Sequence, residues 1–140
     1  LFNVPLNRMR NMKYLLLCMA FLSVACGGKQ QDYRKAEDAL DAGREFINSK
    51  LQGDFSKAAF YTLPNEKNTG ILQEMERSYR KKNREGRQQW RTASINIKEV
   101  KDLNDSITVI YFQNSSDKLA DTIYVVKQKG DWLVDISKKE

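Results

Sequence analysis

Apolar side chains recur at steps of three and four residues from Asp32 onward, which is the spacing of one face of an α-helix. Gly53 follows the last of them, and glycine commonly ends a helix because it accepts a left-handed backbone. The pattern therefore predicts a long amphipathic helix that ends at Gly53. Its apolar stripe consists of Ala36, Ala39, Leu40, Gly43, Phe46, Ile47 and Leu51.

Two further helices are predicted before residue 87. Asp54 can cap a short one that stops at Pro64-Asn65, because its carboxylate can accept hydrogen bonds from the first free N–H groups. Asn68 or Thr69 can cap the next, which should fade into basic residues and end near Gly86. The apolar faces are Phe55, Ala58, Ala59 and Thr62 in the short helix, and Ile71, Leu72, Met75 and Tyr79 in the other.

From Trp90 onward the pattern is typical of β-strands. Ile95 and Ile97 alternate with polar residues, and Val100 and Leu103 then fall out of phase, as they would after a β-bulge. Residues 106–113 are β-branched and aromatic, which predicts a strand covered on both faces. Two more strands are predicted at 121–127 and 132–136, joined by a turn at Lys129-Gly130-Asp131.

Helices followed by an antiparallel meander indicate the α+β class. The expected architecture is three N-terminal helices packed on a curved four-stranded antiparallel sheet, with the sheet curling around the first, long helix. The chain shows neither internal repeats nor a low-complexity tract.

The N-terminal residues have the pattern of a bacterial lipoprotein signal. Lys13 is followed by an apolar run at residues 14–25, and then by Cys26 and a pair of glycines. This run is shorter than the roughly 20 residues that a membrane-spanning helix needs. Ser23 and Ala25 provide the small side chains that cleavage requires, although Ser23 stands where such signals usually have leucine. Cys18 is a poorer candidate because Leu17 precedes it.

This interpretation divides the chain into four parts. Residues 1–11 are an upstream extension, with Met12 as the natural start; 12–25 are the signal peptide; 26–31 form a lipidated tether; and 32–140 form the folded domain. An alternative is that the apolar run is an uncleaved anchor or a buried helix. With lipid on Cys26, the expected location is the cell envelope, at its periplasmic or outer-membrane face, with the membrane as a partner.

Composition narrows the chemistry of the mature part. Cleavage before Cys26 removes three of 24 basic residues and none of 18 acidic ones, so the net charge falls from +6 to +3. The remaining cysteine would carry lipid, which excludes an internal disulfide. The chain has no histidine, the commonest general base and metal ligand. We therefore expect no metal site, no cofactor and no Ser-His or Cys-His nucleophile.

Two segments of the domain resemble a known family. The segment 44–58 (REFINSKLQGDFSKA) has a long helix ending in Gly-Asp before a short helix, and 122–136 (TIYVVKQKGDWLVDI) is similar to a closing hairpin with a Lys-x-x-Gly turn before tryptophan. Together with the lipoprotein signal, they resemble small bacterial lipoproteins with a nuclear-transport-factor-2-like (cystatin-like) domain, a kind catalogued as a domain of unknown function. The resemblance covers nearly all of residues 32–140.

The resemblance implies a cone-shaped α+β fold with a pocket between sheet and helices, and it leaves the function open. The wider superfamily includes isomerases, dehydratases, ligand binders and interaction modules. An enzyme of the isomerase or dehydratase type would need an aspartate base and a phenolic or acidic donor in the pocket. Asp121, Asp135, Tyr111 and Tyr124 lie on predicted strands, but their spacing selects no pair, so no catalytic residue is assigned.

A basic run precedes the first strand, with Tyr79 and Trp90 interleaved; its cations are Arg77, Arg80, Lys81, Lys82, Arg84, Arg87 and Arg91. Such a run is typical of nucleic-acid binding, but an exported lipoprotein would meet anionic lipid headgroups or an acidic protein instead. Candidate contacts with such a surface are Arg80, Lys81, Lys82 and Arg84. The alternative, which we favour, is a solvated helix end whose cations suit the helix dipole.

Four aromatic residues are candidates for the pocket: Tyr111, Tyr124, Trp90 and Trp132. The alternative for the tryptophans is a place in the core or at its rim. The sequence thus predicts a lipid-anchored envelope protein that binds a small ligand or a protein partner without catalysis. An enzyme in the same pocket, and a scaffold that contacts anionic surfaces through its basic helix end, remain alternatives.

Overall fold

The computed structural model describes residues 32–138, which form four helices and one four-stranded antiparallel sheet. The α+β class and the antiparallel meander are confirmed, and the sheet order is β1-β2-β3-β4. The elements are α2 (Ala39–Gln52), α3 (Phe55–Phe60), α4 (Glu66–Lys81), α5 (Arg84–Arg91), β1 (Ile95–Asn104), β2 (Ile107–Asn114), β3 (Ala120–Gln128) and β4 (Asp131–Asp135). The predicted extension, signal, tether and Cys26 lie outside the described residues.

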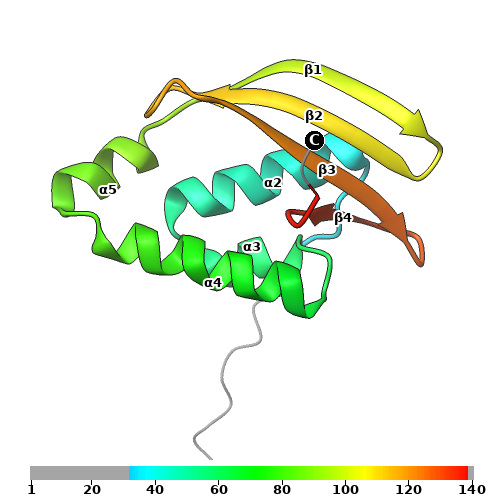
Figure 1. The fold of residues 1–140 in the computed structure, drawn as a ribbon, viewed down its shortest axis with the longest axis horizontal. Coiled ribbons are helices and arrows are strands. Elements are labelled where there is room, and N and C mark those ends of the chain that lie inside the picture. Colours follow the sequence, from blue (N-terminus) through cyan, green and yellow to red (C-terminus); the bar gives the residue numbers. More distant parts are fainter. Residues whose placement is uncertain (1–31, 139–140) are drawn as a thin grey trace, which may run out of the picture. The chain divides into compact units, whose positions relative to one another are not determined.

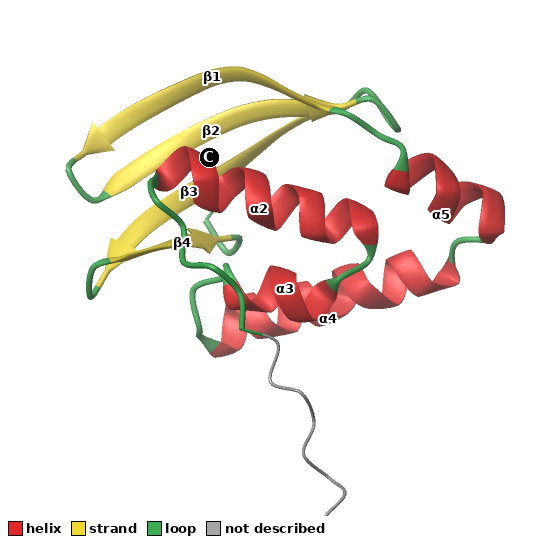
Figure 2. Ribbon diagram, turned by 180° about the vertical axis from the view of Figure 1, so that it is seen from behind, coloured by secondary structure: helices red, strands yellow, loops and turns green. Residues whose placement is uncertain are grey.

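The sheet curves over α2, and α3 and α4 lie on the other side of that helix (Figure 1). Seen from behind, α5 stands beyond the end of α2 and leads into the sheet through the connection to β1 (Figure 2). The curvature places the inner face of the sheet along the length of α2, as expected from the sequence.

Capping residues determine where the first two helices begin and where the first one ends. Asp38 caps α2 by accepting a hydrogen bond from the Asp41 N–H at 2.7 Å, and Gly53 ends it with a φ of 77°. Asp54 then caps α3 by accepting from the Lys57 N–H at 3.0 Å. The predicted end of the long helix and the predicted cap of the short one are therefore confirmed.

The predicted start of the third helix was wrong. The cap of α4 is Asn65, whose side chain accepts from the Asn68 N–H at 2.8 Å. Asn68 is fully buried one turn inside the helix, where its amide donates to the Leu63 carbonyl at 3.0 Å. The sequence pattern places Asn65 in the stop of the preceding helix, but one asparagine can follow a stop and also cap the next helix.

The predicted helix end at Gly86 and the strand start at Trp90 were also wrong. The chain turns extended at Lys82, Asn83 caps a fourth helix, and both Gly86 and Trp90 belong to that helix, α5. Arg, Glu and Gln favour helices but give no apolar stripe to recognise. The helix is held by Trp90, whose ring lies 5.9 Å from that of Tyr79 on α4, a contact that sequence periodicity cannot show.

The strands follow the predicted order with small shifts in their ends. The register of β1 against β2 slips between Ile97 and Glu99, which confirms the expected bulge, and slips again near Asn104. Val109 and Ile110 are adjacent on β2, point to opposite faces and are both buried, so the central part of this strand is covered on both sides as predicted.

The core lies between α2 and the inner face of the sheet. Gly43 marks their closest approach, because a Cβ atom there would lie 2.5 Å from Cδ1 of Ile110 and 3.2 Å from Cδ1 of Ile123. At the β4 edge of the sheet, the chain after α3 pairs with β4, and the Leu63 N–H donates a hydrogen bond to the Val134 carbonyl at 2.8 Å. The core side chains are thereby closed off from solvent along β4.

Candidate functional site

A cavity of about 400 Å³ lies beside the first half of β3. β4 is short and pairs with β3 only from Tyr124 to Gln128, which leaves residues 120–123 without a strand on that edge. The walls come from α2, α4, β3 and the chain after β4, namely Phe46, Lys50, Ile71, Met75, Ala120, Asp121, Thr122, Ile123, Tyr124, Ile136 and Lys138. Most of these side chains are apolar, as in sites that bind small molecules.

Lys50 is the unusual member of this wall. It lies in the last turn of α2, is 9% exposed, and has its ammonium nitrogen 3.9 Å from Oδ2 of Asp121. Burial lowers the pKa of Lys50 below its ordinary value of 10.5, and the carboxylates of Asp121 and Asp117 offset only part of this effect. The cavity wall therefore contains a largely buried lysine whose pKa is lowered by burial.

Two more charged groups belong to the same cavity. The Asp121 side chain is 54% exposed, so solvent screens its attraction for Lys50. Lys138 contributes a second lysine and holds its nitrogen 5.9 Å from the centre of the Tyr124 ring. With two lysines and one aspartate in its walls, the cavity has a positive charge balance.

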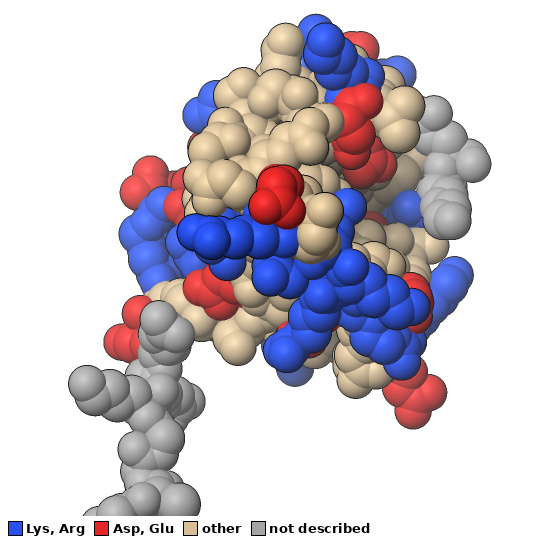
Figure 3. All heavy atoms as spheres, turned by 90° about the vertical axis from the view of Figure 1, so that its left-hand side faces the viewer, with Lys and Arg blue, Asp and Glu red and all other residues tan. Residues whose placement is uncertain are grey.

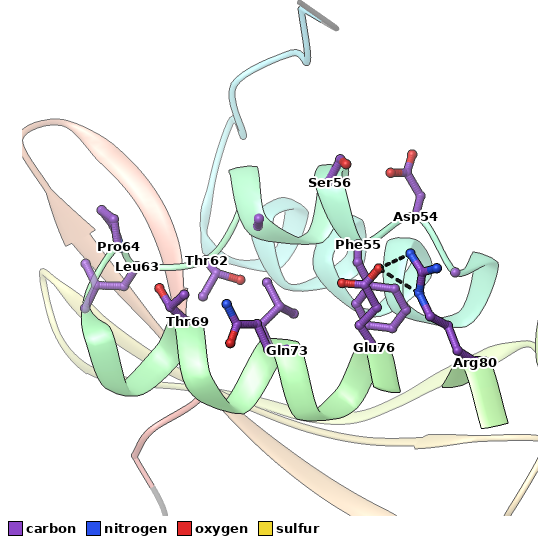
Figure 4. A pocket seen from close by; sticks show the side chains of 13 residues that line it. Asp54, Phe55, Ser56, Thr62, Leu63, Pro64, Thr69, Gln73, Glu76 and Arg80 are labelled. Atoms are coloured by element: carbon purple, nitrogen blue, oxygen red, sulfur yellow. Dashed lines mark hydrogen bonds and ion pairs between the residues drawn. The ribbon is translucent and has the colours of Figure 1, made fainter. Parts of the chain in front are cut away.

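A larger groove of about 570 Å³ runs between α3 and α4 (Figure 4). Phe55 and Leu72 supply apolar surface, and Glu76 and Arg80 point toward each other at its end, forming an ion pair at 2.6 Å. Asp54, which also lines it, is engaged in capping α3. The charges of the groove are thus matched within the domain, and it has no counterpart to the buried Lys50.

The four aromatic residues predicted for a pocket do not line one pocket together. Tyr124 lines the cavity, whereas Trp132 lines a separate hollow with Leu40 and Val100 near the tip of β1. Trp90 packs on Tyr79, and Tyr111 lies on β2 opposite Thr122 of β3.

The candidate acids also lie in different surroundings. Asp135 is buried, but its Oδ1 accepts hydrogen bonds from the Ser137 hydroxyl at 2.7 Å and the Ser137 N–H at 3.1 Å. Burial by itself raises the pKa of Asp135, yet these bonds and one from Asn68 outweigh it and leave the pKa lowered. Asp135 is therefore held as a carboxylate, unlike a base tuned toward neutral pH.

The basic side chains gather over the end of the domain at which α5 lies (Figure 3). Of the four predicted surface contacts, Arg80 pairs with Glu76, and Lys82 lies over the Trp90 ring at 4.5 Å from its centre. Lys81 and Arg84 are exposed. Nearby, Arg87 donates a hydrogen bond to the Lys82 carbonyl at 2.7 Å. This basic side chain therefore stabilises the connection between α4 and α5.

Sequence reasoning missed Lys50, although a signal for it existed. It lies four residues after Phe46 and therefore on the apolar stripe of the long helix, where a lysine is out of place. A charged residue on a buried helix face points either to a partner inside the protein or to a ligand.

Within residues 32–138, no helix is long and apolar enough to cross a membrane. The same residues contain no cluster of three or more Asp, Glu, Cys or His side chains placed to hold a metal ion.

No protein-family model matches the chain, and no significant match to it exists among curated proteins or solved structures.

Proposed function

We propose that this chain is a lipid-anchored ligand-binding module of the bacterial cell envelope, with a nuclear-transport-factor-2-like domain that holds a small molecule beside β3. The cavity is the observation that carries the proposal. At about 400 Å³ it lies within the usual range of roughly 300–1,000 Å³ for small-molecule sites. It also lies between the sheet and the helices, the place that the family resemblance implies for a pocket.

Two local features support the nuclear-transport-factor-2-like assignment. The long helix ends at Gly53 with a left-handed backbone and passes directly to a capped short helix. The closing hairpin turns at Lys129 and Gly130, with φ values of 52° and 87°, and leads to Trp132 on β4. These are the two segments on which the resemblance rests.

The proposal does not include catalysis. Asp121 is the carboxylate that shares the cavity with Tyr124, and it is largely solvated and faces Lys50. Asp135 is held ionised by Ser137. Neither arrangement resembles the desolvated acid that an isomerase-type site needs.

The cavity can be tested by filling it. We expect a small molecule to co-purify with the native protein and to be detected by native mass spectrometry. Replacing Ile71 by tryptophan should reduce its occupancy at least about tenfold, because the indole would occupy the apolar part of the cavity. Gln73→Trp is the matched control, since Gln73 lies on the same helix but lines the groove. If Gln73→Trp lost the ligand and Ile71→Trp retained it, the ligand would bind in the groove between α3 and α4 and not in the cavity beside β3.

The anchor has a separate test. Cys26→Ser should leave an unlipidated precursor that incorporates no labelled palmitate, because serine lacks the thiol that accepts the lipid. Cys18→Ser should be labelled like the natural chain. Palmitate labelling of the Cys26 variant would refute the assignment.

A further inference from the structure

The environment of Lys50 indicates what kind of molecule the cavity binds. Its side chain carries an ammonium group among apolar residues, at the end of a helix that is otherwise packed into the core. Removing a charged group from water is costly unless the protein supplies a close partner with good hydrogen-bond geometry.

Residues 32–138 do not supply such a partner for Lys50. The distance of 3.9 Å between Lys50 Nζ and Asp121 Oδ2 is too long for a hydrogen bond. Within the described part of the chain, the Lys50 ammonium donates no hydrogen bond. Lys57 on α3 shows the contrast, because its nitrogen lies 2.6 Å from Oε2 of Glu45. Lys50 therefore keeps donors for a ligand in a cavity whose walls are mostly apolar.

We propose that the cavity binds a small carboxylate with an apolar chain, with the carboxylate on Lys50 Nζ and the chain along Phe46, Ile71 and Met75. This inference rests on the proposed ligand-binding function and adds the chemical class of the ligand. A carboxylate would supply the close, charge-assisted hydrogen bonds that Asp121 does not. The apolar walls would accept the hydrocarbon part of the molecule.

The charges around Lys50 favour a single negative charge on the ligand. Asp121 and Asp117 face Lys50 from β3 and from the loop before it, and Lys138 is the other cation in the walls. No arginine lines this cavity, so its walls lack the planar, bidentate contacts that arginine makes with a phosphate. The walls carry two lysines and one aspartate, an excess of one positive charge that a single carboxylate would neutralise, and Asp117 acts on Lys50 from outside the walls.

The test compares two probes with the same eight-carbon skeleton, octanoate, which carries a charged carboxylate, and 1-octanol, which carries a neutral hydroxyl. The full chain is used with Cys26→Ser, so that no attached lipid competes for the cavity. Both probes are titrated at pH 7 while the methyl resonances of Ile71, Met75 and Ile123 are followed by NMR. We expect octanoate to bind at least about tenfold more tightly than octanol, because its bond to Lys50 is charge-assisted.

Variants of Lys50 isolate its contribution. Lys50→Met should lose the preference for octanoate and keep the affinity for octanol, since methionine preserves the apolar volume. Lys50→Arg should retain the preference, and Lys138→Met should retain most of it. Equal binding of both probes by the natural cavity, or an undiminished preference in Lys50→Met, would overturn the inference and leave the ligand-binding function standing. If neither probe shifts the cavity methyls, the inference fails, and the proposed function also fails if no ligand that Ile71→Trp displaces co-purifies with the protein.

Discussion

Replacing Gly53 by alanine is expected to lower the free energy of unfolding by about 3 kcal/mol, from backbone strain and overpacking together. The φ of 77° is unfavourable for any residue with a Cβ atom. The added Cβ would also lie 2.4 Å from Cε1 and 2.6 Å from Cζ of the Tyr79 ring. That ring has little freedom to move, because it packs between Phe55 and Trp90 with ring centres 5.8 and 5.9 Å away.

Gly130 provides the matched control. It has a similar φ of 87°, but a Cβ atom there would meet nothing within 4 Å. Gly130→Ala should therefore cost only the backbone strain, about 1 kcal/mol. Urea unfolding of both variants, followed by circular dichroism, gives the two free energies. Equal losses at the two positions would mean that the contact with Tyr79 relaxes at no cost.

The contact at Gly53 matters beyond local stability because Tyr79 joins three helices. Its hydroxyl donates to the Gln52 carbonyl at 3.4 Å and accepts from Arg91 Nε at 3.2 Å. Tyr79 thereby links the end of α2 to α4 and α5. Since α4 also carries Ile71 and Met75, the position of this helix determines the cavity wall.

The parts of the fold that were predictable from the sequence are those with a local physical signal. Gly53 and Asp54 identify a helix end and a helix start by backbone freedom and side-chain capping, without any knowledge of the rest of the chain. The closing hairpin is identified in the same way by Lys129 and Gly130, whose positive φ values suit a tight turn between strands.

The parts that were not predictable depend on contacts between distant residues. α5 has no apolar stripe, and its one large apolar side chain, Trp90, is explained only by Tyr79 in the neighbouring helix. The cavity likewise combines Phe46, Ile71 and Ile136, which are far apart along the chain and meet only once β4 has ended early. Of its polar members, Lys50 alone could have been singled out, as a lysine on an apolar helix face.

Replacing Lys50 by methionine is expected to raise the free energy of unfolding of the ligand-free protein by about 2 kcal/mol at pH 7, because an apolar side chain avoids the cost of burying a poorly paired ion. Asp121 would not be left as a buried charge, since its side chain is 54% exposed. A lysine that lowers stability where methionine would raise it is the trade-off expected of a binding residue, and it accords with a role in holding an anion.

The pH dependence of this gain follows from the lowered pKa of Lys50 in the folded state. Below that pKa the lysine is charged in both states, so the folded protein bears the full cost of burial. Between the lowered pKa and the ordinary 10.5, Lys50 is protonated to a greater extent in the unfolded chain than in the folded protein. The free energy of unfolding of the natural protein therefore increases as pH rises through this range. The advantage of Lys50→Met should therefore be largest below the lowered pKa and disappear above 10.5, as measured by urea unfolding of both proteins from neutral pH upward.

Lys57→Met serves as the control because folding raises the pKa of Lys57, whereas it lowers the pKa of Lys50, so the stability contributions of the two lysines change with pH in opposite directions. The hydrogen bond to Glu45 raises the pKa of Lys57 above 10.5, so this lysine stabilises the fold below that pH and stops doing so as pH rises through its raised pKa. Lys57→Met should thus be less stable than the natural protein at pH 7, with a deficit that shrinks in strong alkali. If Lys50→Met were also destabilised at pH 7, the Lys50 ammonium would be well satisfied inside the protein, and the charge argument for an anionic ligand would lose its basis.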